Sequence, residues 1–74
     1  MKLFGYEEGN DEQKTPIQLS EASILASPGE LRAIAKVLAE LASEMEGDGF
    51  DHAHLTDRLP SLAGGPELIV VKVR

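Results

Sequence analysis

The sequence predicts a small α+β domain with the element order β-β-α-β, in which one helix covers one face of a three-stranded mixed sheet. Three observations support this prediction: a helix-start motif before a long amphipathic stretch, two short apolar stretches ahead of it, and a β-branched stretch near the end. Seventy-four residues leave room for one hydrophobic core, so we expect a single domain over residues 1–74.

Two strands are expected before the helix. Residues 2–7 are rich in aromatic and apolar side chains, and Gly5 among them indicates a bulge or a close backbone contact. A polar loop that ends at Pro16 follows. Residues 17–26 then return as a second strand, which should pair antiparallel with the first.

The helix is predicted over residues 28–46. Ser27 is a good N-cap, Pro28 suits the first helical position, and Glu30 stands where a capping box requires an acid. Gly47 supplies the stop. Behind the cap, apolar residues recur at helical spacing on one face, namely Leu31, Ile34, Ala35, Leu38, Leu41, Ala42 and Met45.

The last strand is predicted over residues 67–73 and is apolar on both faces. Its side chains form two alternating sets, Ile69, Val71 and Val73 on one face and Leu68 and Val70 on the other. One helix can cover only one face of a sheet. The other face must therefore be covered by the loop over residues 48–66, by a second copy of the protein, or by a partner.

The charge balance limits the class of partner. Thirteen acidic and seven basic residues give a net charge of −6, which argues against binding to nucleic acid or to anionic membranes. A basic protein is the natural electrostatic complement. The first residues contain no apolar run long enough for a signal peptide or a membrane span, so we expect a cytoplasmic protein. Cysteine is absent, which excludes disulfides and thiolate-bound metals.

Acidic residues crowd the C-terminal end of the predicted helix, where the helix dipole favours cations. They are Glu40, Glu44, Glu46 and Asp48. The unfavourable charge has two explanations: general solubility, or an acidic patch held for a basic partner.

Both histidines of the chain, His52 and His54, lie among aspartates in one short segment. If this segment is extended, the two imidazoles lie on one side at a spacing that suits one zinc ion, with Asp57 as an oxygen ligand. In a helical turn, Asp51 and Asp57 would instead flank His54 and orient it for proton transfer, although so small a fold offers little concavity for a substrate. Hydrogen bonding within an irregular loop and display to a partner protein are the remaining interpretations.

Five segments spread over nearly the whole chain carry a family resemblance. They are the opening Lys2-Leu3-Phe4-Gly5-Tyr6, the stretch from Leu19 to Ile24, the helix start Ser27-Pro28-Gly29-Glu30-Leu31-Arg32, the segment Phe50-Asp51-His52-Ala53-His54-Leu55-Thr56-Asp57 and the closing Pro66-Glu67-Leu68-Ile69-Val70-Val71. In sequence and order they resemble the small immunity-protein family numbered thirty-two of bacterial polymorphic toxin systems. The helix start and the His-x-His-Leu-x-Asp pattern are the most specific of them.

The resemblance implies a non-enzymatic protein that needs no cofactor and neutralises a cognate bacterial toxin by occluding it. The acidic balance of the chain is compatible with a basic toxin, because opposite charges speed association. The partner-binding residues would be acids, histidines and two apolar anchors, namely Glu40, Glu44, Glu46, Asp48, Phe50, Asp51, His52, His54, Leu55 and Asp57.

Two alternatives from other classes stay open. One is a small metal-binding protein that uses His52, His54 and Asp57 as ligands. The other is a homodimeric structural module, which would associate through its exposed sheet face or through residues 67–73.

Overall fold

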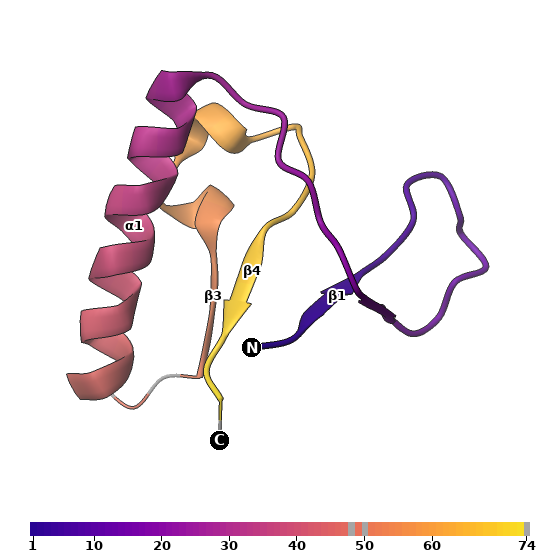
Figure 1. Cartoon of the computed structure of the whole chain (residues 1–74), viewed down its shortest axis with the longest axis horizontal. Helices are drawn as coiled ribbons and strands as arrows, with labels where there is room; N and C mark the ends of the chain where they lie inside the picture. Colours follow the sequence, from indigo (N-terminus) through magenta and orange to yellow (C-terminus); the bar gives the residue numbers. More distant parts are fainter. Residues whose placement is uncertain (48, 50, 74) are drawn as a thin grey trace.

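In the computed structural model, one long helix stands beside short strands, which confirms a small α+β fold (Figure 1). The structure describes every residue except 48, 50 and 74. In chain order the elements are β1 (Leu3–Gly5), β2 (Ile17–Leu19), α1 (Pro28–Gly47), β3 (His52–His54), the 3₁₀ turns η1 (Leu55–Asp57) and η2 (Pro60–Leu62), and β4 (Ile69–Val71).

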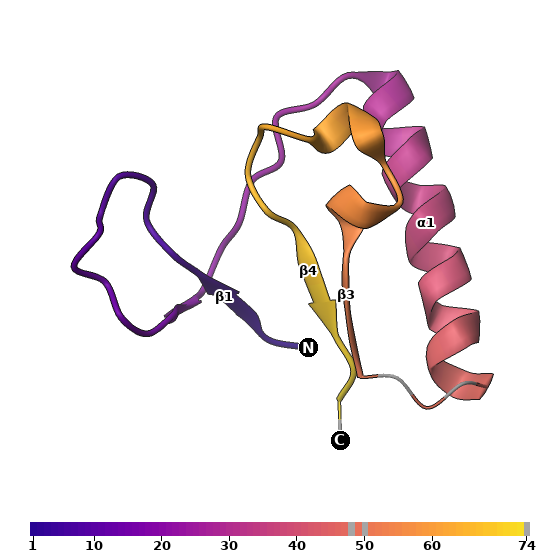
Figure 2. The same ribbon diagram turned by 180° about the vertical axis from the view of Figure 1, so that it is seen from behind.

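The sequence predicted one three-stranded mixed sheet, and this prediction is wrong. The described strands form two separate two-stranded sheets. β1 pairs antiparallel with β2, as expected, but these two strands form a sheet of their own. β4 pairs antiparallel with β3, a strand inside the connection that was predicted to be a loop. In both views β3 lies between α1 and β4, and the β1–β2 hairpin stands on the far side of β4 (Figure 1 and Figure 2).

Helix α1 begins as the capping box predicts. The Ser27 hydroxyl oxygen accepts a hydrogen bond from the Glu30 backbone N–H at 3.1 Å, and the Glu30 carboxylate accepts one from the Ser27 N–H at 2.9 Å. The bond from the Ser27 backbone is the main reason that the pKa of Glu30 lies below its ordinary value. The helix runs on through Gly47, just beyond the predicted end, and the left-handed residue that follows is Gly49, with φ 74°.

The core forms where α1 packs on the β3–β4 layer. Ile34, Val37, Leu41 and Leu55 make the buried cluster, with Ala53, Leu59, Leu62 and Val70 half-buried against it and Met45 buried further along the helix. The buried stripe of α1 differs from the predicted one, because Val37 belongs to it while Leu31 and Leu38 are 46% and 41% exposed. A two-stranded layer covers a narrower arc of a helix than the predicted three-stranded one, so the flank of the apolar face stays uncovered.

The connection over residues 48–66 holds β3, η1 and η2 and is more ordered than a loop. Leu55, Leu59 and Leu62 anchor it in the core. Pro60 begins η2, and Gly64 then adopts a φ of 86°, which only glycine adopts without strain, as the chain turns toward β4.

Both N-terminal strands are shorter than predicted. β2 ends at Leu19, and the residues from there to α1 lie outside any strand. The close contact expected at Gly5 is present, because a Cβ on that residue would lie 3.2 Å from the Leu19 Cδ1. The result is a small hairpin beside the helix-bearing unit rather than a sheet continuous with it.

Candidate partner-binding surface

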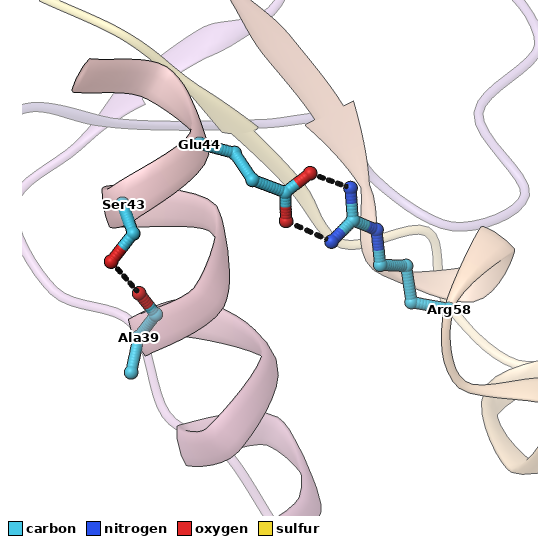
Figure 3. A network of polar contacts seen from close by, with 4 residues as sticks. All are labelled: Ala39, Ser43, Glu44 and Arg58. Carbon is cyan, nitrogen blue, oxygen red and sulfur yellow. Dashed lines mark hydrogen bonds and ion pairs between the residues drawn. The ribbon is translucent and has the colours of Figure 1, made fainter. Parts of the chain in front are cut away.

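The acidic end of α1 is partly neutralised within the chain. Both carboxylate oxygens of Glu44 face the guanidinium of Arg58, which follows η1, in a two-pronged ion pair (Figure 3). Arg58 Nη2 lies 2.7 Å from Glu44 Oε1. The hydrogen bonds from Arg58 hold the pKa of Glu44 below its ordinary value, and the same pairing raises the pKa of Arg58. Glu44 therefore ties α1 to the end of η1, and it is not a free charge for a partner.

Two other members of the predicted acidic patch remain available. Glu40 and Glu46 are exposed, and neither forms a salt bridge within the described part of the chain. Asp48 lies outside the described residues. The cation that the helix end lacks in its own sequence comes from the residue after β4, because Lys72 Nζ donates a hydrogen bond to the Met45 carbonyl at 2.8 Å.

The two histidines lie on the outer face of the β3–β4 sheet, away from α1. The strand register pairs His52 with Val71 and His54 with Ile69, whereas Ala53 between them packs against the core. The imidazole centroids are 5.9 Å apart, with the rings edge to face. Both rings thus lie on one side of an extended segment, which is one of the two conformations that the sequence left open.

Each imidazole has a carboxylate beside its Nδ1 atom. His52 Nδ1 is 3.0 Å from Asp51 Oδ1, and His54 Nδ1 is 3.1 Å from Glu67 Oε1. The same Glu67 oxygen accepts a hydrogen bond from the Thr56 hydroxyl at 2.8 Å. That bond is the main reason that the pKa of Glu67 lies below its ordinary value, with the His54 bond second. Glu67, which the sequence did not single out, joins β3 and η1 to the chain just before β4.

The geometry does not favour the metal-binding or proton-transfer interpretations. Among the residues that the structure describes, no three histidine or acidic side chains come together as a metal site. Asp57 is exposed on η1 and does not complete a ligand set with the histidines. His54 hydrogen-bonds to Glu67 rather than lying in a helical turn between two aspartates.

Of the two predicted apolar anchors, the structure describes only Leu55. Leu55 is 0% exposed and packs in the core, so its side chain stabilises the fold and cannot contact another protein. This corrects the prediction that Leu55 anchors a partner. Phe50 lies outside the described residues.

An exposed apolar surface on β4 and just after it was predicted only as a homodimer interface and was not among the predicted toxin-binding residues. Ile69, Val71 and Val73 are 46%, 66% and 81% exposed, so the outer face of this strand is uncovered, as its two apolar faces had suggested. Opposite it stands the hairpin, whose Phe4 and Tyr6 are 56% and 63% exposed. An open groove of about 860 Å³ runs between them and is lined by residues of both.

Comparison with known proteins decides the family. A family model described as immunity protein 32 matches residues 21–73, which is most of the chain. The chain belongs to this family. No curated protein and no solved structure matches it. The match confirms the family resemblance over residues 21–73, and the opening segment, residues 2–6, precedes the matched range.

The match covers one part of this immunity protein 32 family member and not the other. Residues 21–73 include α1, β3, β4 and every core residue described above. The β1–β2 hairpin precedes the matched range entirely. In the described part of the chain, no helix combines the length and the apolar character that crossing a membrane requires.

Proposed function

We propose that the protein is an immunity protein that binds a cognate bacterial toxin in the cytoplasm and neutralises it by occluding the surface the toxin acts with. The observation that carries this proposal is the family match over residues 21–73. In the proposed mechanism the protein contributes no chemistry of its own and needs no cofactor.

The charge of the chain supports a basic toxin. Its net charge of −6 would steer a basic partner toward it, and such steering raises association rates by about 10-fold or more at low salt. Glu40 and Glu46 are the exposed carboxylates of the predicted patch on α1, and Asp57 is exposed on η1. The imidazoles of His52 and His54 add hydrogen-bonding groups on the outer sheet face.

The state of the polar side chains supports binding rather than catalysis. The hydrogen-bonding groups nearest the histidines tie one element to another, as Glu67 does with Thr56 and His54. A general acid or base also needs a pocket that holds a substrate. Two open hollows of the described surface are lined mainly by apolar side chains.

Protection of growing cells tests the proposal. A candidate toxin domain, identified by affinity capture from the native host, would be placed under an inducible promoter in a laboratory bacterium, with or without this protein from a second promoter. We expect the toxin alone to stop growth, co-expression to restore it, and the two purified proteins to elute as one complex. Failure to restore growth at equal levels of soluble protein would contradict the proposal.

A double charge reversal tests whether the acidic end of α1 contributes. We expect Glu40→Lys together with Glu46→Lys to slow association with the toxin domain about 10-fold at low salt, with a smaller loss at high salt because salt screens exposed charges. Glu21→Lys, at an exposed glutamate outside the predicted site, serves as the control. Association rates that do not depend on salt would count against an electrostatic interface.

A further inference from the structure

Strand β4 has one paired edge and one open edge. The backbone N–H of Lys72 donates to the Asp51 carbonyl at 2.7 Å, so the even-numbered residues of this segment hydrogen-bond toward β3. The backbone groups of Ile69 and Val71 therefore point to the other edge. Within the described chain, no hydrogen bond joins them to another strand. Such an edge is a template for an added strand.

The side chains at this edge would be buried by such a strand. Ile69 and Val71 lie on the outer face of the sheet, opposite the face that packs on α1, and both are substantially exposed. When an extended peptide joins an open edge, main-chain hydrogen bonds provide affinity and alternate side chains provide specificity. The edge of β4 supplies both kinds of group at the same two residues.

The hairpin gives this edge a second wall. The groove between them is lined on one side by residues 1–6, Pro16, Leu19 and Ala22, and on the other by Leu68, Ile69, Val71, Lys72 and Val73. No carboxylate lines it, whereas Lys2 and Lys72 do, and the ammonium group of Lys72 is hydrogen-bonded to the Met45 carbonyl. In both views the hairpin stands beyond β4 and away from α1 (Figure 1 and Figure 2).

Acidic residues begin where the groove ends. Tyr6 and Pro16 flank the loop that joins β1 to β2, and both line the groove. The loop carries four exposed carboxylates, those of Glu7, Glu8, Asp11 and Glu12. None of them forms a salt bridge among the described residues, in contrast to Glu44 on α1. A segment that enters the groove therefore meets a mainly apolar floor and, at one end, a loop in which four carboxylates outnumber the single cation, Lys14.

We propose that the groove between β4 and the hairpin receives an extended segment of the cognate toxin, which adds to the open edge of β4 as a strand. The segment that fits has alternate apolar side chains, which cover Ile69 and Val71, and basic residues at the end that meets the hairpin loop. This inference rests on the proposed function and identifies the chemistry of the partner surface.

Charge favours a toxin segment over a second copy of this chain. A second copy would bring another net charge of −6 and another acidic hairpin loop to the same place. A basic segment is attracted by the same loop. Electrostatics therefore favours binding of the toxin segment and disfavours binding of a second copy.

Amide hydrogen exchange of the ¹⁵N-labelled full chain, free and bound to the toxin domain of the co-expression experiment, tests the strand addition. In the free protein we expect the Ile69 and Val71 amides to exchange fast and the Val70 and Lys72 amides, which face β3, to exchange slowly. In the complex, the Ile69 and Val71 amides should slow by about 100-fold or more. Contact through side chains alone would leave this alternation unchanged.

Two matched substitutions test the same edge by affinity. Val71→Lys places a charge on the open edge, which opposes strand addition, and Ala35→Lys places the same side chain at an exposed position on α1. Val71 is 66% exposed, so its substitution should leave the fold intact, which circular dichroism would check. We expect Val71→Lys to weaken toxin binding at least 10-fold and Ala35→Lys to leave it unchanged.

The outcomes separate this proposal from the function it rests on. A toxin complex of wild-type protein in which Ile69 and Val71 amides stay fast, or equal binding by Val71→Lys and wild type, would overturn the strand addition and leave the immunity function standing. Protection of these amides in concentrated protein without toxin would assign the edge to a second copy and overturn the proposal. If the wild-type protein neither binds nor protects, the proposed function fails and the strand addition falls with it.

Discussion

The two parts of this small protein are held together by different forces. Among the described residues, every fully buried side chain lies in the unit of α1, β3, β4 and the turns between them. The hairpin has none, and a single half-buried amide organises its loop. Gln13 Nε2 donates to the Gly5 and Thr15 carbonyls at 3.1 and 3.0 Å, while its Oε1 accepts the Glu7 N–H at 2.7 Å.

The difference in burial indicates which part of the protein is stable and which part can adapt. Apolar burial is the dominant favourable term in folding, so the helix-bearing unit is the stable part. A two-stranded hairpin alone is marginal at best. The family match covers the packed unit, and the hairpin precedes the matched range.

The largest change in the free energy of unfolding should come from a substitution that leaves a cavity in the core. Leu55→Ala removes a fully buried side chain and should cost about 2–5 kcal/mol in the free energy of unfolding, against roughly 4–11 kcal/mol for a whole chain of this length. Phe4→Ala in the hairpin should change it by about 0.5 kcal/mol or less, because that side chain is 56% exposed. Urea unfolding monitored by circular dichroism measures both. Similar losses would show that the hairpin shares the core.

A smaller effect is expected at the joint between β4 and α1. Lys72→Met removes the cation that meets the last carbonyls of the helix, and should cost about 0.3–1 kcal/mol. Lys2→Met removes the same charge before the hairpin and should cost nothing measurable, since Lys2 is exposed. The same urea experiment at low and high salt compares them. A loss that does not shrink at high salt would indicate packing of the lysine stem rather than charge.

Local sequence signals predicted the helix of the packed unit better than they predicted which strands pair with each other. The capping box at Ser27 and Glu30 and the apolar spacing of the helix are set by neighbouring residues, so they can be read without a fold. The pairing of β4 depends on β3, whose three residues, His52–His54, are too few to show a strand period. Because β3 could not be recognised from so few residues, nothing in the sequence indicated that the strands form two separate sheets.

The candidate site shows the same division. The common side of the two imidazoles follows from strand geometry and was predictable. The ion pair of Glu44 with Arg58 and the bond of His54 to Glu67 join residues 14 and 13 positions apart, so no sequence spacing marks them. Long-range pairing of this kind decides which carboxylates stay free, and composition alone overestimated the acidic patch.

Acid should weaken the packed unit in a predictable direction. The folded-state pKa values of Glu30, Glu44 and Glu67, all in this unit, are lowered by hydrogen bonds to Ser27, Arg58 and Thr56. The folded protein therefore binds fewer protons than the unfolded chain as the pH falls through and below about 4.5, the ordinary value, and stability present above that pH is lost progressively. The loss should be modest, because exposed carboxylates are well solvated.

Urea midpoints between pH 7 and pH 3 would measure this loss. Glu44→Gln should remove its share of the pH dependence, because the amide does not titrate. Stability that rises on acidification would contradict the assignment of these three hydrogen bonds to the folded state.

The smallest change in the free energy of global unfolding is expected from substitution of Gln13, the residue whose side chain makes the most hydrogen bonds in the hairpin. Gln13→Ala removes three hydrogen bonds, so we expect amides of β1 and β2 to exchange roughly 10-fold faster or more, since each bond contributes about 1 kcal/mol. The free energy of global unfolding should change by about 0.5 kcal/mol or less, because the core is untouched. If α1 and β4 amides lost protection together with the hairpin, the two parts would be one cooperative unit. The hairpin wall of the groove could then not adapt to a partner without disturbing the core.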